Sequence, residues 1–424
     1  MSINRNIPPH FGDIQMPIVP DYESATLPNG VQMHVLRGGA QPLVKVDLLV
    51  KAGSLRSDKP LVARAVANLI AEGTRSHTSK DIAQKIDFYG AGFWNSVSHG
   101  NTVISLLCLS RDVANVLPLV EEIIKEPTFP KEEVDLYVAQ EVQSFDVSIL
   151  KSSFVASRAM LKALYADDDR HSRIAMREDY LNLDSQALKQ FHSDTYRPAG
   201  AHVFVSGLPS EADIRIISDA FGSRWSGGQD WKASVPRFNS EVRRDFIDFD
   251  AKQTSLRMTR RVFNRNEPDY LTFQVANVAL GGYFGSRLMQ TLREKLGLTY
   301  GVSSYIAANS LSGIHCISSE VKSGSHLQAI DVINGEMERL TTELVSDKEL
   351  NSIRGFMLGD ILRYFDSVTT SADTLLSFLM DDVPASHVAE FYNVVKNISP
   401  SEIREVARRW LKPELYNVIC VGKM

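Results

Sequence analysis

Ten histidines are the side chains of this chain best able to bind a catalytic metal, so their spacing is the first chemical clue. A helix presents two imidazoles to one metal ion when the histidines are three or four positions apart. No two histidines have that spacing, since they stand at His10, His34, His77, His99, His171, His192, His202, His315, His326 and His387. The sequence also lacks a GxSxG motif, a P-loop and a CxxC pair. The residues therefore predict no independent active site in this chain.

A guanidinium and a phenol lie close together in the segment GGYFGSRLMQTLREKLGLTYGVSSY, residues 281–305. Its leucines predict a short helix that Gly297 ends, and the residues after the glycine predict a strand. Arg293 suits a helix C-terminus, where the helix dipole favours a cation, and Tyr300 suits an ordinary strand position. The glycine-rich start of the segment lacks the Lys-Ser/Thr pair of a phosphate loop. Residue types alone leave both a structural and a chemical role open for Arg293 and Tyr300.

The segment SDKPLVARAVANLIAEGT, residues 57–74, predicts one helix. Ser57 or Asp58 can cap its start, Pro60 suits the first turn and Gly73 suits the C-terminal stop. Apolar residues at helical spacing predict a buried stripe made of Val62, Ala65, Val66, Leu69 and Ile70. Three residues are predicted to lie off this stripe, namely Arg64, Ala67 and Asn68.

Three parts of the first half resemble the start of the pitrilysin/insulinase family of zinc peptidases: ATLPNG, the EGT that ends the helix, and KIDFYGAGFWNSVSHGNTVISL. In active members this helix carries H-x-x-E-H, in which the two histidines bind zinc and the glutamate is the general base. Aligning Gly73-Thr74 with the family's GT places Arg64, Ala67 and Asn68 where His, Glu and His belong. The resemblance therefore implies that this chain binds no catalytic metal, because a fixed guanidinium would oppose Zn²⁺.

The third zinc ligand of the family is a carboxylate on a later helix, and the resemblance places it at Gln143 or Ser144. Neither residue is a carboxylate, and Glu141 is predicted to point from a different face of the helix. The segment at residues 93–106 resembles the family's edge strand, which holds substrate as an added β-strand. In a chain without the metal, this strand is expected to be vestigial.

The string SRL…LREK-GL-Y resembles the signature of the family's C-terminal domain. In members that cleave peptides, the Arg and Tyr, here Arg293 and Tyr300, bind the substrate carbonyl and stabilise the oxyanion. The resemblance implies a zinc-less subunit of a two-chain bacterial peptidase. Its homologous partner would bind the zinc, and peptides would be enclosed between the chains. Two alternatives stay open: a scaffold protein, like the processing-peptidase relatives in respiratory complexes, and a peptide-binding homodimer of the same fold.

The chain contains the same unit twice. TYRPAGAHVFVSG ends the first half and WLKPELYNVICVG ends the second, and their prolines, Pro198 and Pro413, are 215 positions apart (413 minus 198). In each half, alternating apolar strands precede long helices. This order predicts an α+β fold of two homologous domains, each with a mainly antiparallel sheet and helices packed on one face, and the resemblance implies a LuxS/metallohydrolase-like fold. The predicted domains are residues 1–223 and 241–424, joined by a polar linker at 224–240.

Composition narrows the partners and the compartment. The net charge is only −5, which favours neither nucleic acid nor an anionic membrane surface, and no apolar run is long enough to span a bilayer. The first residues show no export or transit signal. Cys108, Cys316 and Cys420 each lie in an apolar, strand-like run and are expected to be buried and reduced. Together these features lead us to expect a cytoplasmic protein.

Overall fold

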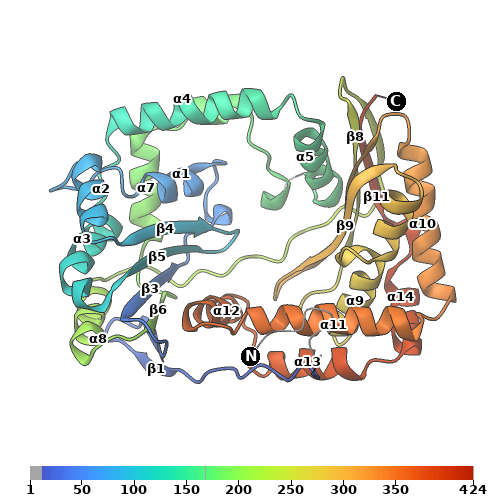
Figure 1. Ribbon diagram of the computed structural model, residues 1–424. Helices are drawn as coiled ribbons and strands as arrows, with labels where there is room; N and C mark the ends of the chain where they lie inside the picture. The colour runs from blue at the N-terminus through green and yellow to red at the C-terminus, as the bar shows by residue number, and fades with distance from the viewer. Residues whose placement is uncertain (1–11, 168, 424) are drawn as a thin grey trace, which may run out of the picture.

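Two β-sheets, one in each half of the chain, form the framework of the molecule (Figure 1). It is seen in a computed structural model that describes residues 12–423 except residue 168. The first sheet has the order β1-β2-β6-β3-β5-β4 and the second the order β7-β11-β8-β10-β9. The strands are β1 Glu23–Thr26, β2 Gln32–Arg37, β3 Leu43–Val50, β4 Gly92–Val97, β5 Thr102–Leu109, β6 His202–Gly207, β7 Arg244–Asp248, β8 Gln253–Val262, β9 Thr299–Ala308, β10 Gly313–Lys322 and β11 Asn417–Gly422. Among the strand pairs of the described residues, only β2–β6 and β7–β11 are parallel, so both sheets are mainly antiparallel, as predicted.

The internal repeat is visible in the strand order. Strands β6 and β11 begin and end 215 positions apart (417 minus 202), which is the spacing of the repeated sequence. Each lies between a parallel neighbour and an antiparallel one, β2 and β3 in the first sheet and β7 and β8 in the second. The two halves therefore share one connectivity. His10 and the start of the chain, where no export signal is expected, lie outside the described residues.

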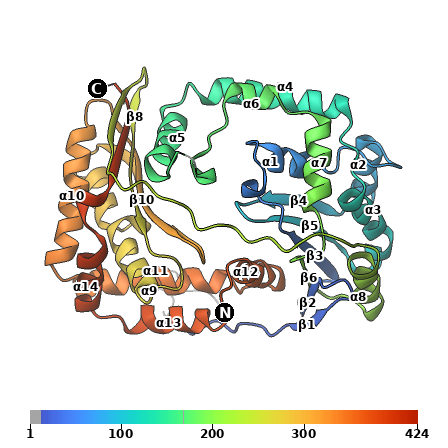
Figure 2. The same cartoon turned by 180° about the vertical axis from the view of Figure 1, so that it is seen from behind.

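Fourteen α-helices complete the described part of the chain (Figures 1 and 2). In the first half they are α1 Val62–Leu69, α2 Ser79–Phe88, α3 Val113–Lys125, α4 Lys131–Ser148, α5 Ser152–Leu164, α6 Arg177–Leu181, α7 Ser185–Thr195 and α8 Glu211–Ser218. In the second half they are α9 Tyr270–Asn277, α10 His326–Thr342, α11 Asp347–Arg363, α12 Val368–Met380, α13 His387–Asn397 and α14 Pro400–Trp410. Most of them cover one face of the sheet in their own half, and the main cores lie there.

The opposite face of each sheet is covered by a helix from the other half. Because strand side chains alternate between faces, Leu49 points away from the main first-half core that contains Leu48 and Val50. It packs instead with Leu375 and Leu376 of helix α12. Helix α5 of the first half packs in the same way on strands β8 and β11 of the second sheet. We call α5 and α12 the exchanged helices.

The segment between the sheets is less uniformly polar than predicted. Residues 224–240 contain no helix or strand, and Figure 2 shows them running from the first half to the second. Trp225, however, is buried in the first-half core, and its indole N–H donates a hydrogen bond to the carbonyl oxygen of Tyr196 at 3.3 Å. Phe238 forms an isolated bridge with Tyr165. The segment is therefore anchored near both of its ends.

The cysteines are free and buried, as predicted, on strands β5, β10 and β11. Burial raises the pKa of the Cys108 and Cys420 thiols to about 12, so neither forms an appreciable amount of thiolate near neutral pH. Among the helices of the described residues, none combines the length and the apolar composition needed to cross a bilayer.

Three buried histidines make the stability of this fold sensitive to acid. Burial lowers the pKa of His34 and His192 to about 4 and that of His315 to about 3. The unfolded chain binds protons at these positions near pH 6.5, so below that pH it binds more protons than the folded chain. The free energy of unfolding should therefore fall as the pH drops from about 6.5 towards 4, and urea titrations at several pH values would measure this.

The matched control for the pH series is His192→Gln. His192 Nε2 donates to the carbonyl oxygen of Ile124 at 2.8 Å, and glutamine keeps a donor without a titrating group. The variant should lose stability less steeply on acidification, by up to about 1.4 kcal/mol per pH unit for this one group. Parallel pH dependences for the variant and the parent protein would contradict the assignment.

Candidate functional site

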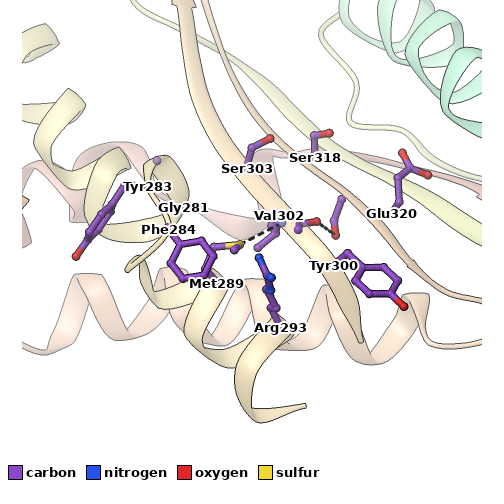
Figure 3. Close-up of a pocket in the computed structure, with 13 residues that line it drawn as sticks. Gly281, Tyr283, Phe284, Met289, Arg293, Tyr300, Val302, Ser303, Ser318 and Glu320 are labelled. Carbon is purple, nitrogen blue, oxygen red and sulfur yellow. Dashed lines mark hydrogen bonds between the residues drawn. The ribbon is translucent and has the colours of Figure 1, made fainter. Parts of the chain in front are cut away.

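Arg293 and Tyr300 line the same pocket, of about 480 Å³, in the second half (Figure 3). Arg293 belongs to a π-helical segment, Met289–Lys295, in which the N–H of Leu296 bonds the carbonyl oxygen of Thr291 at 3.1 Å. The predicted stop is present at Gly297, whose φ of +61° favours glycine. Strand β9 starts two residues later, so one tight turn brings the arginine and the tyrosine to one pocket. Segments with π-helical bonding are frequent at functional sites.

Both side chains are free to meet a ligand. Tyr300 is 86% exposed, and Arg293 is exposed as well. In Figure 3 the Arg293 side chain lies between the rings of Phe284 and Tyr300, and its guanidinium carbon is 5.0 Å from the centre of the Phe284 ring. Neither the guanidinium nor the phenol hydroxyl forms a hydrogen bond or ion pair with another described residue. Their donors therefore have no structural role within the described chain.

The backbone that carries Tyr300 is held firmly. Strand β9 is the edge strand of its sheet, and its register with β10 shifts between Ser319 and Val321. At this bulge the Thr299 hydroxyl donates to the carbonyl oxygen of Glu320 at 2.8 Å, and the Ser319 hydroxyl donates to that of Gly301 at 2.9 Å. Bulges of this kind redirect a side chain at the end of a strand.

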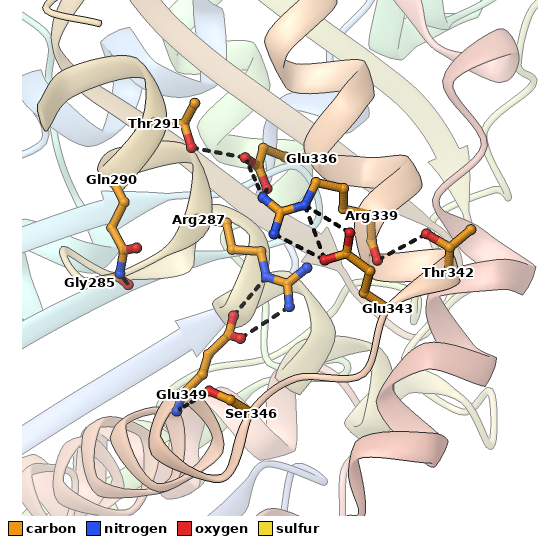
Figure 4. Close-up of polar contacts among 10 residues, drawn as sticks. All are labelled: Gly285, Arg287, Gln290, Thr291, Glu336, Arg339, Thr342, Glu343, Ser346 and Glu349. Carbon is orange, nitrogen blue, oxygen red and sulfur yellow. Dashed lines mark hydrogen bonds and ion pairs between the residues drawn. The ribbon is translucent and has the colours of Figure 1, made fainter. Parts of the chain in front are cut away.

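A network of ion pairs fastens the helix of Arg293 to its neighbours (Figure 4). Arg287 donates two hydrogen bonds to the carboxylate of Glu349 on α11, at 2.7 and 3.0 Å. Thr291 donates to Glu336 on α10 at 2.9 Å, and Glu336 in turn accepts from Arg339 at 3.1 Å. Bidentate arginine–carboxylate pairs fix orientation as well as distance. The helix therefore presents Arg293 from a rigid base.

The predicted helix of this segment needs one correction. Leu288 and Leu292 are buried as expected, but Leu296 is 42% exposed. The π-helical turn adds a residue and rotates Leu296 outward. In the glycine-rich start, Gly281 and Gly282 end the preceding π-helical segment rather than opening a loop, and a Cβ on Gly281 would lie 2.7 Å from that of Ser304.

Helix α1 is shorter than predicted. It begins at Val62, after Leu61 with a left-handed φ of 72°, and ends at Leu69. Ser57 and Asp58 do not cap it, because Asp58 pairs with Arg170 instead. Pro60 precedes the helix, and Gly73 forms a bridge with Thr78 beyond its end. The predicted stripe is buried throughout, at Val62, Ala65, Val66, Leu69 and Ile70.

The three residues expected off that stripe fall into two groups. Arg64 and Asn68 are exposed, but Ala67 is fully buried, and its carbonyl oxygen accepts a hydrogen bond from Asn95 Nδ2 at 2.8 Å. Ala67 lies off the main-core stripe, as predicted, and it is buried nevertheless because strand β4 packs on this side of α1.

Helix α4 places Tyr137, which the sequence did not single out, and Glu141 beside helix α1. Arg64 Nη2 lies 3.7 Å from Glu141 Oε2, and Asn68 Nδ2 donates to the Tyr137 hydroxyl at 3.3 Å. Gln143 and Ser144 are exposed. Glu141 therefore faces Arg64, contrary to the prediction. Tyr137 and Glu141 are four positions apart on α4, and that spacing could have placed both on one face of the helix.

Comparison with known proteins identifies the relatives of this chain. A model of insulinase (peptidase family M16) matches residues 38–178, and a model of the peptidase M16 inactive domain matches residues 182–355. The chain belongs to the M16 peptidase family. An uncharacterized zinc protease of Mycobacterium leprae is 25% identical over 80% of this M16 chain and 77% of its own length. A non-peptidase homolog of Helicobacter pylori is 20% identical over 86% and 85%.

A solved structure shares the fold of this M16 chain. The crystal structure of a peptidase M16 inactive domain from Pseudomonas fluorescens superimposes with a TM-score of 0.88 at 22% identity, covering 95% of this chain and 98% of that one. The predicted two-sheet architecture is thereby confirmed. The second half of the chain thus matches the M16 inactive domain, and the whole chain has the fold of an M16 peptidase homologue.

The residues at the predicted zinc-motif positions of this M16 chain do not fit a zinc ion. Arg64 brings a permanent positive charge, Ala67 has no donor, and Asn68 is engaged with Tyr137. Within residues 12–423, leaving out residue 168, no three His, Cys, Asp or Glu side chains gather closely enough to hold a metal. Zinc sites need three or four such ligands. We therefore derive no step through a metal bound by this chain.

Strand β4 is the edge of the first sheet, as β9 is of the second. The segment at 93–106, expected to be one edge strand, is a hairpin: β4 and β5 are joined by a turn at Ser98–Asn101, where the Ser98 N–H bonds the Asn101 carbonyl oxygen at 2.8 Å. Of the two strands of this hairpin, only β4 has an edge that pairs with no other described strand.

Proposed function

We propose that this chain is the zinc-less subunit of a two-chain M16 peptidase and that it supplies Arg293 and Tyr300 to the zinc site of its partner. The observation that carries the proposal is the pocket that these two side chains line without a hydrogen-bond partner among the described residues. A rigid helix and a bulged strand hold donors ready that the fold itself does not use. Such preorganised donors are what the stabilisation of an oxyanion requires.

The chemistry assigned to this chain is electrostatic. The guanidinium of Arg293 would bind the carbonyl oxygen of the scissile peptide, and the phenol hydroxyl of Tyr300 would donate a second hydrogen bond to the same oxygen. Both interactions strengthen as the oxygen becomes negative, so they favour the transition state over the substrate. The partner subunit would supply the zinc ion and the general base. Peptides would be enclosed between the two chains.

The proposal also covers the domain division, the partners and the location of the chain. The division into residues 1–223, the linker 224–240 and residues 241–424 makes the first domain the one with the degenerate motif at Arg64, Ala67 and Asn68. The second domain carries the catalytic pair. We propose a homologous zinc-binding chain and peptides as the partners, with no nucleic acid and no membrane, and a cytoplasmic location.

Reconstitution with a zinc-binding homologue tests the proposal. The chain, an H-x-x-E-H relative from the same organism and their mixture should be assayed on a quenched fluorescent peptide, with zinc determined for each sample. We expect cleavage only in the mixture and much less than one zinc per molecule of this chain. If the relative is equally active alone, or if this chain binds one tight zinc, the proposal fails. A stable homodimer that binds peptides without cleaving them would favour the peptide-binding alternative, and no peptide binding at all would favour the scaffold.

A further inference from the structure

A second pocket, of about 250 Å³, lies in the first half beside Arg64. Four cationic side chains line it, and none of the described aspartates or glutamates does. We call this set the basic pocket: Lys59, Arg64, Arg170 and Arg173. A pocket lined by side chains of one charge raises the local concentration of ligands with the opposite charge. The basic pocket lies on the half of the chain that does not carry Arg293 and Tyr300.

The charges of the basic pocket are only partly compensated. Arg170 pairs with Asp58, and Arg64 lies 3.7 Å from Glu141. Arg173 donates only to backbone carbonyl oxygens, those of Ser57 at 3.1 Å and Asp58 at 2.9 Å. Neither Arg173 nor Lys59 has an ion-pair partner among the described residues. The pocket therefore keeps an excess of positive charge.

The basic pocket lies beside the β4 edge of the first sheet. A larger hollow, of about 700 Å³, is lined by Asn68, by Arg64 and by the end of strand β4 with the turn after it, residues 95–99. The two hollows share Ser54, Arg64 and His99, so they adjoin each other. An extended chain that paired with the unpaired edge of β4 would run along the larger hollow. Its end, or a side chain near it, would reach the basic pocket.

We propose that the basic pocket binds a carboxylate of an extended peptide lying along β4. Arg64 stands at the junction of the two hollows and is 59% exposed, so its guanidinium can contact a carboxylate there. Lys59 and Arg173 also line the pocket and supply further positive charge. The carboxylate belongs either to the C-terminus of the peptide or to an acidic side chain, and both present the same two oxygens. The degenerate metal position then serves as an anion site, which this chain forms without a partner.

Fluorescence anisotropy with the full chain alone tests this proposal. The probes are labelled eight-residue peptides: one with a free C-terminus and no acidic side chain, its C-terminally amidated form, and an amidated form with one glutamate near the end. We expect the neutral amidated peptide to bind about tenfold more weakly than at least one of the other two. Stronger binding of the free C-terminus identifies the terminal carboxylate, and stronger binding of the glutamate peptide identifies a side chain.

Two substitutions and a control connect the effect to the basic pocket. Arg64→Gln and Lys59→Gln are both at exposed positions and should each remove most of the preference for the carboxylate peptide, about fivefold to tenfold. Arg75→Gln, on an 81% exposed arginine that does not line the pocket, should leave it unchanged. Equal affinities for all three peptides, or a preference that survives both substitutions, would overturn the proposal. Because no partner takes part, that failure would leave the role of Arg293 and Tyr300 untouched.

Discussion

Replacing Arg293 with alanine is expected to lower the kcat of the paired peptidase by about 10²- to 10³-fold, with little change in KM. The reason is that the guanidinium contacts the Phe284 ring but has no hydrogen-bond or ion-pair partner among the described residues, so its N–H donors remain for the reacting oxygen. An interaction that strengthens only in the transition state appears in kcat rather than in substrate binding. Steady-state kinetics of the reconstituted two-chain enzyme on one peptide would measure the effect.

Two further variants sharpen that experiment. Tyr300→Phe removes only a hydroxyl from a side chain that is 86% exposed, so the fold should not change while kcat falls by about 10²-fold. Lys295→Ala removes a cation from the same helix, two residues from Arg293 and outside the pocket lining, and should leave kcat within about twofold. Full activity in both pocket variants would exclude the oxyanion role. Equal losses in all three would indicate a general disturbance of the helix.

Replacing Lys45 with methionine is expected to destabilise the fold by about 3–5 kcal/mol. The side chains of Lys45 and Asp47 are only 4% and 1% exposed, and their charged atoms are 3.1 Å apart. Burial is the largest influence on Asp47 and raises its pKa. Removing the ammonium group would leave this carboxylate with Ser105 as its remaining hydrogen-bond donor. The midpoint of urea unfolding would record the loss.

The same ammonium group also pairs with Asp373 of the exchanged helix α12. Because Asp373 is 59% exposed, Asp373→Asn should cost less than about 1 kcal/mol and serves as the control. The double variant Lys45→Met with Asp47→Leu should recover most of the stability, since replacing a whole buried pair is often neutral. A double variant no more stable than Lys45→Met would show that the loss came from packing and not from an unpaired charge.

Much of the architecture could be predicted because it depends on patterns of apolar residues and prolines within short segments of the sequence. The repeated Pro-then-strand segment at Pro198 and Pro413 leads in both halves to an inner strand of a sheet, β6 or β11, and the alternation of apolar residues predicted β2, β3 and β5. Contacts between distant residues could not be predicted in this way. Helix α1 starts late because Arg170, more than a hundred positions away, holds Asp58 in a loop.

In the candidate site, too, features within one segment could be predicted and contacts between distant segments could not. Arg293 and Tyr300 share one short segment, so their proximity followed from sequence. The partner of Arg64 was missed because Glu141 reaches it only through the packing of α4 beside α1. The basic pocket adds Arg170 and Arg173 from a third part of the chain. The exchanged helices were hidden for a related reason, since an amphipathic helix shows which face it buries but not which sheet it covers.

The exchanged helices also decide how the chain can be divided. Helix α5 covers apolar residues of the second sheet, and α12 covers those of the first, so each half would expose a bare apolar face if it were produced alone. If a protease cut the chain within residues 224–240, the two fragments should remain associated through the exchanged helices. Separate expression of the halves should give aggregation-prone products, while co-expression can restore the native particle. The two repeats are thus not independent folding units, because each needs a helix of the other to cover its sheet.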